Sequence, residues 1–154
     1  MKRWLVPLLL LAVVTMGEGL FHGTDVAKLE PVELVTLCQT AAGIEVRTDT
    51  GSVGLGATVT DAVEKMKDTA PGEIFLDTAE YVVLTDLNEE NLADLTACFR
   101  PSCKILFLSG AAKPEDLAAF LRSRPQKLTL QDWRLTGKQP PVLISEGGII
   151  RFAE

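Results

Sequence analysis

The sequence predicts an α/β (α+β) fold, in which a mixed β-sheet is covered by about three helices and carries β-hairpins at its ends. Three observations lead to this expectation. Segments with strand periodicity alternate with segments of helical periodicity through the middle of the chain. Residues 81–84 and 105–108 are runs of consecutive apolar side chains, typical of strands covered on both faces. Turn-forming residues separate pairs of short alternating segments near both ends.

The first elements are expected to form a hairpin. Leu29 to Cys38 alternates as a strand does, Ala42-Gly43 provides a turn, and Ile44 to Thr50 alternates again with one partly exposed face. The following stretch, Gly51 to Ala57, is too rich in glycine for a regular element. It is therefore predicted to be a turning connection rather than a strand.

A helix is expected to start at Thr58, because Asp61 follows three residues later in the manner of a capping box. Pro71-Gly72 would end it. Its buried stripe recurs at i, i+3, i+4 and i+7 and consists of Val59, Ala62, Val63 and Met66.

The centre of the sheet is predicted at Glu80 to Thr85, preceded by a short strand at Glu73 to Leu76. Asn88 is the expected cap of a helix that runs to about Phe99. Leu87 and Leu92 are spaced as a hydrophobic staple for that helix, and its buried stripe would be Leu92, Leu95 and Phe99.

The carboxyl-terminal part predicts a strand at Lys104 to Ser109 and a helix opened by Pro114. Leu128 to Leu130 suggests a short strand, and Gly137 to Pro141 reads as a linker. The inward side chains of the Pro114 helix would be Leu117, Phe120 and Leu121. Two strands, Val142 to Ser145 and Ile149 to Phe152, flank Glu146-Gly147-Gly148 as a terminal hairpin.

The amino terminus has the layout of a secretory signal. Lys2 and Arg3 precede an apolar run from Trp4 to Met16, which gives way to small and polar residues. This run is shorter than the ~20 residues that a membrane-spanning helix needs. Residues 1–19 are therefore expected to be a signal peptide or an N-terminal membrane tether, followed by a single domain at 26–154 outside the cytoplasm. If the signal is uncleaved, Trp4 to Met16 would be the chain's only contact with a membrane.

The charge balance disfavours nucleic acid as a partner. The chain carries 15 basic and 21 acidic side chains, a net charge of −6, which loss of Lys2 and Arg3 with a signal would shift to −8. Phosphate backbones and anionic head groups are bound by Lys and Arg through counterion release. An acidic surface repels both.

The three cysteines are Cys38, Cys98 and Cys103. Cys98 and Cys103 are spaced to pair across a four-residue turn, a bridge worth about 2 kcal/mol by loop entropy; reduced, buried thiols are the equal alternative. Their C-x4-C spacing matches neither a C-x-x-C redox motif nor a usual zinc site. No metal or other cofactor is predicted.

Side chains for catalysis are scarce. The only histidine, His22, lies beside the expected signal and leaves no imidazole base for the folded domain. Ser109-Gly110 lacks the G-x-S-x-G pattern of a nucleophile elbow, and Gly51, Gly54 and Gly56 lack the pattern of a phosphate loop. The chain is therefore predicted not to be an enzyme.

Two places are candidates for a partner surface. Asp77, Thr78 and Glu80 lie between two predicted strands, where they would line a surface cleft. Trp133 stands outside the periodic stripes and is either a partner-facing anchor or a lid over the sheet edge.

The order of elements resembles the N-terminal domain of the C subunit of spore-germination nutrient receptors, the Ger(x)C-type envelope lipoproteins. The similarity runs from about Val26 to Arg124 and includes a glycine-led helix motif at Gly56 to Val63 and the strand pair at Ile74 to Leu84. Val14 to Gly19 lacks the family's lipobox cysteine. The resemblance implies a non-enzymatic envelope protein that docks with membrane partners.

Residues and resemblance favour the same function. The expected protein is an exported, non-enzymatic binding or assembly module of the cell envelope, related to spore germination or sporulation, with a protein partner in or near the membrane. The alternative is a small extracytoplasmic enzyme or thiol-active protein that uses Cys98 and Cys103.

Overall fold

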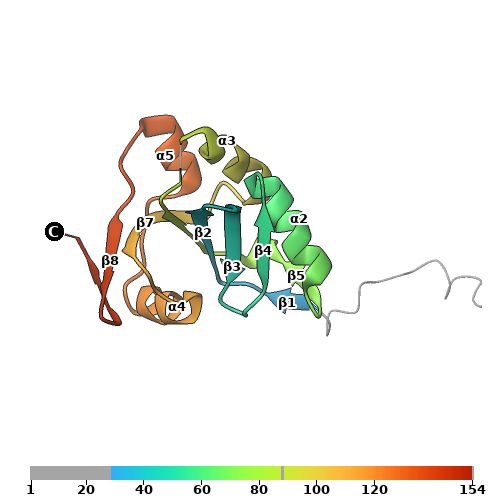
Figure 1. Cartoon of the computed structure of the whole chain (residues 1–154). Helices are drawn as coiled ribbons and strands as arrows, with labels where there is room; N and C mark the ends of the chain where they lie inside the picture. The colour runs from blue at the N-terminus through green and yellow to red at the C-terminus, as the bar shows by residue number, and fades with distance from the viewer. Residues whose placement is uncertain (1–28, 88, 154) are drawn as a thin grey trace, which may run out of the picture.

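A computed structural model describes residues 29–87 and 89–153 as a mixed α/β structure built on a seven-stranded sheet (Figure 1). The expected fold class is confirmed. The strand order is β4-β3-β2-β6-β7-β8-β9. The strands are β1 (Leu29–Pro31), β2 (Leu34–Thr40), β3 (Gly43–Thr48), β4 (Val53–Gly56), β5 (Glu73–Phe75), β6 (Tyr81–Thr85), β7 (Lys104–Gly110), β8 (Val142–Glu146) and β9 (Ile149–Phe152). The helices are α2 (Val59–Thr69), the 3-10 turn η2 (Leu76–Thr78), α3 (Glu89–Cys98), α4 (Pro114–Ser123) and α5 (Leu130–Thr136).

The strand β6 occupies the centre of the sheet, as its apolar run predicted. Tyr81 to Leu84 are all buried, and β6 pairs in parallel with β2 on one side and β7 on the other. β8 extends the parallel part beyond β7, while β3, β4 and β9 are antiparallel additions at the edges. A strand with neighbours on both sides and helices on both faces needs apolar residues at every position.

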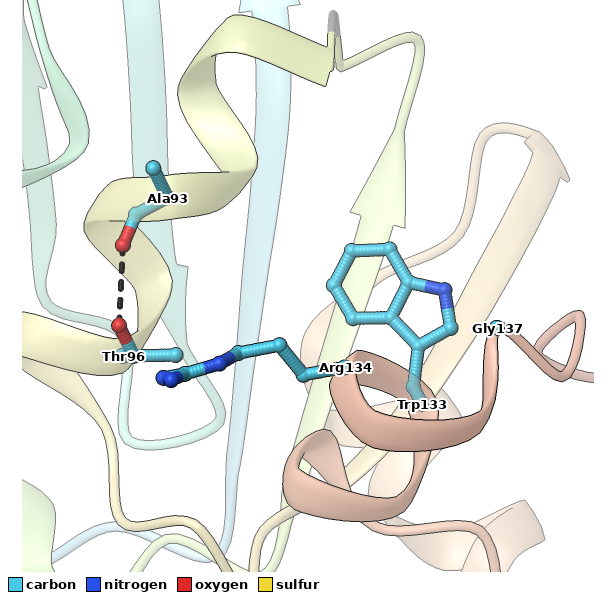
Figure 2. A pocket seen from close by; sticks show the side chains of 5 residues that line it. All are labelled: Ala93, Thr96, Trp133, Arg134 and Gly137. Atoms are coloured by element: carbon cyan, nitrogen blue, oxygen red, sulfur yellow. Dashed lines mark hydrogen bonds between the residues drawn. The ribbon is translucent and has the colours of Figure 1, made fainter.

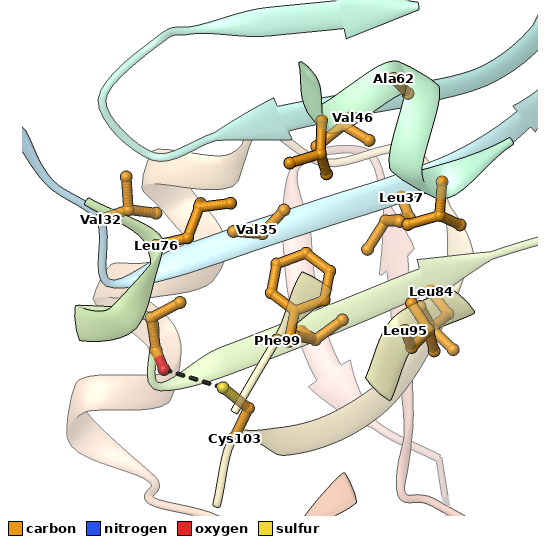
Figure 3. Packing of buried hydrophobic residues seen from close by; sticks show 14 of the residues in the cluster. Val32, Val35, Leu37, Val46, Ala62, Leu76, Leu84, Leu95, Phe99 and Cys103 are labelled. Atoms are coloured by element: carbon orange, nitrogen blue, oxygen red, sulfur yellow. Dashed lines mark hydrogen bonds between the residues drawn. The ribbon is translucent and has the colours of Figure 1, made fainter. Parts of the chain in front are cut away.

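Helices cover the two faces unequally. α2, α3 and α5 pack on one face over the larger core cluster, which Figure 3 shows with Leu95 and Phe99 beside Val35 and Leu84. α4 covers the other face, where Leu117 packs in the smaller cluster. The core therefore has two layers, separated by the sheet.

The predicted strand from Leu29 to Cys38 is wrong in one respect, because it breaks after Pro31. β1 pairs with β5 in a separate two-stranded parallel sheet, and β2 of the main sheet starts only at Leu34. Pro31 has no N–H for a sheet ladder. The next amides bond to side chains instead: Val32 N–H donates to Thr78 Oγ1 at 3.0 Å, and Leu34 N–H to Asp49 Oδ1 at 3.2 Å.

The glycine-rich stretch from Gly51 to Ala57 contains a strand, contrary to the prediction of a connection. β4 pairs with β3 in antiparallel register and forms one edge of the sheet. Gly54 and Gly56 lie directly under α2, where no side chain would fit. The glycines therefore allow α2 to pack closely on the strand, and they do not form a turn.

A helix also replaces the strand predicted at Leu128 to Leu130. Thr129 caps α5 in a reciprocal capping box with Asp132, and only an isolated bridge from Thr129 to Lys104 remains of the expected pairing. Gly137, in the predicted linker, ends the helix in the left-handed conformation with φ 64°. α5 is a fourth α-helix among the described residues.

Three other local predictions are confirmed. Thr58 caps α2 by accepting a hydrogen bond from Asp61 N–H, and Pro114 lies in the first turn of α4. Gly147 and Gly148 have φ of 58° and 84°, as a primed hairpin turn requires. The expected signal at 1–19, the start of the domain at 26, His22 and the Asn88 cap lie outside the described residues, as does the Leu92 side chain. No helix in the described part combines the length and apolarity needed to cross a bilayer.

Candidate functional site

The polar residues predicted to line a cleft, Asp77, Thr78 and Glu80, lie in η2 and the loop that leads into β6. Thr78 Oγ1 is engaged within the fold, since it accepts from Val32 N–H and lies 2.9 Å from Val32 O and 2.8 Å from Phe75 O. The Glu80 carboxylate pairs with Lys104. Thr78 thus connects the end of β5 with the residue after β1, and Glu80 connects the loop before β6 with β7, so of the three residues only Asp77 has no such role.

Trp133 lies on a different surface. It is half-buried in α5 and packs against the larger core cluster. The cavity that Trp133 lines contains none of the three residues from η2 and its loop. The structure therefore does not bring the two predicted partner surfaces together.

A groove lies between α3 and α5 beside Trp133, and we call it the α3–α5 groove. It consists of two depressions, of about 500 and 300 Å³. The first is lined by Ala93, Thr96, Trp133, Arg134 and Gly137 (Figure 2). The second is lined by Thr96, Pro101, Leu130, Gln131, Arg134 and Leu135.

The walls of this groove are held by buried contacts and backbone hydrogen bonds. Leu95 and Phe99 anchor α3 in the core, and Leu130 anchors α5. Leu130 N–H donates to Cys103 O at 2.7 Å, and Gln131 N–H to Pro101 O at 3.0 Å. The start of α5 is thus fastened to the loop that follows α3, which fixes the spacing of the two walls.

The described surface of the groove is largely apolar, with two neutral polar side chains, Thr96 and Gln131, and one cation. Arg134 is the only charged residue among its described lining residues. Figure 2 shows Arg134 extending from α5 toward Thr96 on α3, while the indole of Trp133 projects from the same helix. Thr96 Oγ1 donates to Ala93 O at 3.0 Å within its own helix. Leu135 is 73% exposed and adds apolar surface beside the second depression.

The three cysteines are free thiols, so the disulfide considered between Cys98 and Cys103 is not formed. The two sulfurs have different neighbours: Cys98 Sγ lies 3.6 Å from Thr60 Oγ1 on α2, and Cys103 Sγ donates to Ala79 O at 3.0 Å. Burial is the main cause that raises the pKa of all three thiols. A raised pKa favours the protonated, unreactive form.

A second, smaller cavity lies where the parallel strands end, and the sequence did not suggest it. It has a volume of about 250 Å³ and includes Cys38 of β2 and Thr85 of β6. Asp86, the residue after β6, has a positive φ of 51°. Ligands of open α/β sheets often bind at this edge. Arg47 also lines this cavity, but it is paired with Glu45. Burial, together with the charge of Asp86, raises the pKa of the Cys38 thiol.

Clusters of His, Cys, Asp and Glu that could hold a metal ion are absent from the described part of the chain. The α3–α5 groove, which places a half-buried tryptophan and an exposed leucine beside two depressions, is the candidate site. No protein-family model, no curated protein and no solved structure matches this chain. The fold and the groove define a small α/β domain with a largely apolar groove between α3 and α5.

Proposed function

We propose that this protein is an exported, non-enzymatic binding module of the cell envelope that holds a protein partner in the α3–α5 groove. The observation that carries the proposal is the arrangement on α5, where Trp133 and the exposed Leu135 lie beside two depressions. Tryptophan and arginine are enriched among residues that dominate binding energy, especially where they border a preformed pocket.

The groove is suited to binding because its walls are already ordered. Trp133 is half-buried against the core, so a partner that covers its remaining surface would restrict few additional side-chain rotations. The apolar lining favours a partner that contributes apolar side chains. Among the described residues of this lining, none forms a nucleophile paired with a base, which supports recognition rather than catalysis.

The location of the partner is inferred from the sequence. The signal-like segment at 1–19 favours export, and the resemblance to germination-receptor C subunits favours a partner in or near a membrane. The acidic composition disfavours nucleic acid. A role in spore germination or sporulation is the most specific form of the proposal.

Thiol chemistry at Cys98 and Cys103 is the less favoured alternative. A dithiol mechanism needs two sulfurs within bonding reach and a lowered thiol pKa. The contacts of these two thiols point to separate neighbours, and burial raises both pKa values.

Site-specific photo-crosslinking in the source cells tests the proposal. A benzophenone amino acid at Gln131, in the groove, is expected to capture a discrete protein adduct, whereas the same group at Ile149 on β9 is not. Ile149 is a matched control because it is 70% exposed, lies on the edge strand β9 and is not among the described residues that line the groove.

A second variant tests whether the Gln131 adduct depends on the groove itself. Leu135→Asp places a charge in the groove without disturbing the core, because Leu135 is 73% exposed. The Gln131 adduct should disappear in this background. An adduct that persists in Leu135→Asp, or no adduct at Gln131, would contradict binding in the α3–α5 groove.

A further inference from the structure

Arg134 is distinguished from the other described arginines by its lack of a partner. Arg47, Arg122 and Arg151 each pair with a carboxylate of this chain. Arg124 lies over the ring of Phe120, 4.9 Å from its centroid, and Arg100, which makes no ion pair with a described residue either, interacts with the Cys103 side chain. Within the described residues, Arg134 makes no ion pair, although the chain is rich in acidic side chains.

The position of Arg134 is as informative as its charge. Arg134 and Thr96 line both depressions of the groove, so the two hollows meet at these residues. Apolar surface lies on either side, with Trp133 bordering one hollow and Leu135 the other. The groove therefore presents an apolar, cationic, apolar sequence of surfaces.

We propose that the α3–α5 groove recognises a peptide segment in which an Asp or Glu side chain stands between two apolar side chains, and that Arg134 binds that carboxylate. This inference rests on the proposed function, because it names the chemistry of the partner at the same site. The guanidinium of arginine presents a planar set of donors that matches a carboxylate.

The arrangement favours an internal carboxylate over a chain terminus. A segment that fills both hollows must pass over Arg134, which places its acidic group in the middle. A terminal carboxylate on Arg134 would leave one of the two hollows empty. Apolar groups on both flanks also exclude water from the ion pair, which strengthens an otherwise weak surface interaction.

Selection from a phage-displayed library of random linear peptides, with the full chain as bait, tests the motif. Peptides enriched on the wild-type protein are expected to carry Asp or Glu flanked by apolar residues. Arg134→Gln should retain the apolar preference and lose the acidic one. Arg122→Gln, which removes an exposed arginine of α4 on the opposite face, is the matched control and should select the wild-type motif.

A binding cycle with one selected peptide gives the magnitude. Replacing its acidic residue with the corresponding amide should weaken binding to the wild-type protein roughly three- to tenfold. The same replacement should have no effect on binding to Arg134→Gln. The wild-type difference should also shrink as salt is added, because screening weakens an exposed ion pair.

The outcomes separate this inference from the proposed function. If the enriched peptides are apolar and lack an acidic residue, the role of Arg134 is overturned. If Leu135→Asp no longer binds those peptides, the groove is still the binding site. If the enriched peptides bind only with a free carboxyl terminus, the internal acidic segment is overturned as the occupant. The same holds if laurate, an apolar chain that ends in a carboxylate, displaces them. Enrichment that is unaffected by Leu135→Asp would overturn both proposals.

Discussion

The carbonyl oxygen of Ala62 lies so close to Gly54 that a Cβ built on Gly54 would stand 2.1 Å from it. The side chain and amide of Met66 are nearly as close, at 2.7 Å. Helix α2 thus rests directly on the backbone of the edge strand β4. This contact seals the larger core at the β4 edge of the sheet.

Gly54→Ala is expected to destabilise the protein by about 3 kcal/mol, because the added methyl group forces α2 away from β4. Urea unfolding followed by circular dichroism measures the change. Gly51→Ala is the matched control: it has no neighbour within 4 Å, and its φ of 97° predicts a smaller loss of about 1–2 kcal/mol from backbone strain alone. Equal losses in the two variants would show that helix contact is not the cause.

Thr78→Val tests whether Thr78 holds the fold together. The substitution keeps the shape of the side chain and removes the hydroxyl that accepts from Val32 N–H and donates to a backbone carbonyl. A loss of about 1 kcal/mol in unfolding free energy is expected, whereas Thr78→Ser, which keeps the hydroxyl, should lose less. If both variants unfold like the wild type, the hydroxyl has no structural role and becomes available for binding.

The Asp49 carboxylate gives a pH dependence of defined sign. Burial raises its pKa, although Leu34 N–H and Glu33 N–H donate to it and oppose the shift. The folded state therefore holds the proton to higher pH than the unfolded state. Its contribution to stability is complete below the unfolded pKa of about 3.9 and is lost as pH rises through the folded pKa.

Asp49→Asn keeps an oxygen acceptor for these amides and removes the titration. Its unfolding free energy relative to the wild type should therefore increase as pH rises above about 4. Urea unfolding at a series of pH values measures this difference. Asp61→Asn should show the opposite trend, and only at pH below about 4, because Lys65 and Ala57 N–H lower the pKa of Asp61 and the stability this gives is lost as pH falls through that lowered pKa. A relative stability of Asp49→Asn that falls with rising pH would contradict the assignment.

The thiols are expected to titrate as three free groups when the protein is unfolded in guanidinium chloride without reductant. In the native protein Cys103 should react with Ellman's reagent only through unfolding, because it is 1% exposed. Cys103→Ala should remove this slow phase. A single reactive thiol in the unfolded protein would instead indicate a Cys98–Cys103 disulfide and would revive the thiol-active alternative.

Local patterns predicted the parts of the fold that depend on neighbouring residues in the chain. The apolar run at Tyr81 to Leu84 marked the central strand, because only a strand covered on all sides tolerates it. Thr58 and Asp61 marked the start of α2, and Gly147-Gly148 marked the terminal turn. In each case the physical cause lies within a few residues of the signal.

Errors arose where a distant element supplied the cause. Gly54 appeared to interrupt a strand, but its lack of a side chain serves α2, which packs across it. Pro31 ended a strand whose alternation continued through it, because the following amides bond to Thr78 and Asp49 instead of a neighbouring strand. The short α5 was missed although Thr129 and Asp132 form a capping box that the sequence displays.

The candidate site divides in the same way. Trp133 was predicted from its isolation outside the periodic stripes, while Arg134, Leu135 and the α3 side of the groove were not. The sequence did hold one signal for this side of the groove. Leu130 and Leu135 are five residues apart on one short helix, so when Leu130 is in the core, Leu135 is left without a core position. Asp77, Thr78 and Glu80 were predicted for their polarity, yet two of them are engaged within the fold.

By itself, the sequence determined the α/β class, the central strand and most helices. These follow from periodicity, capping and composition, which act over short stretches of chain. Only the tertiary structure decided that α3 and α5 lie side by side and that Arg134 separates two apolar hollows. That juxtaposition depends on hydrogen bonds from the start of α5 to Pro101 and Cys103 and on shared burial in one core, neither of which is encoded in any single segment.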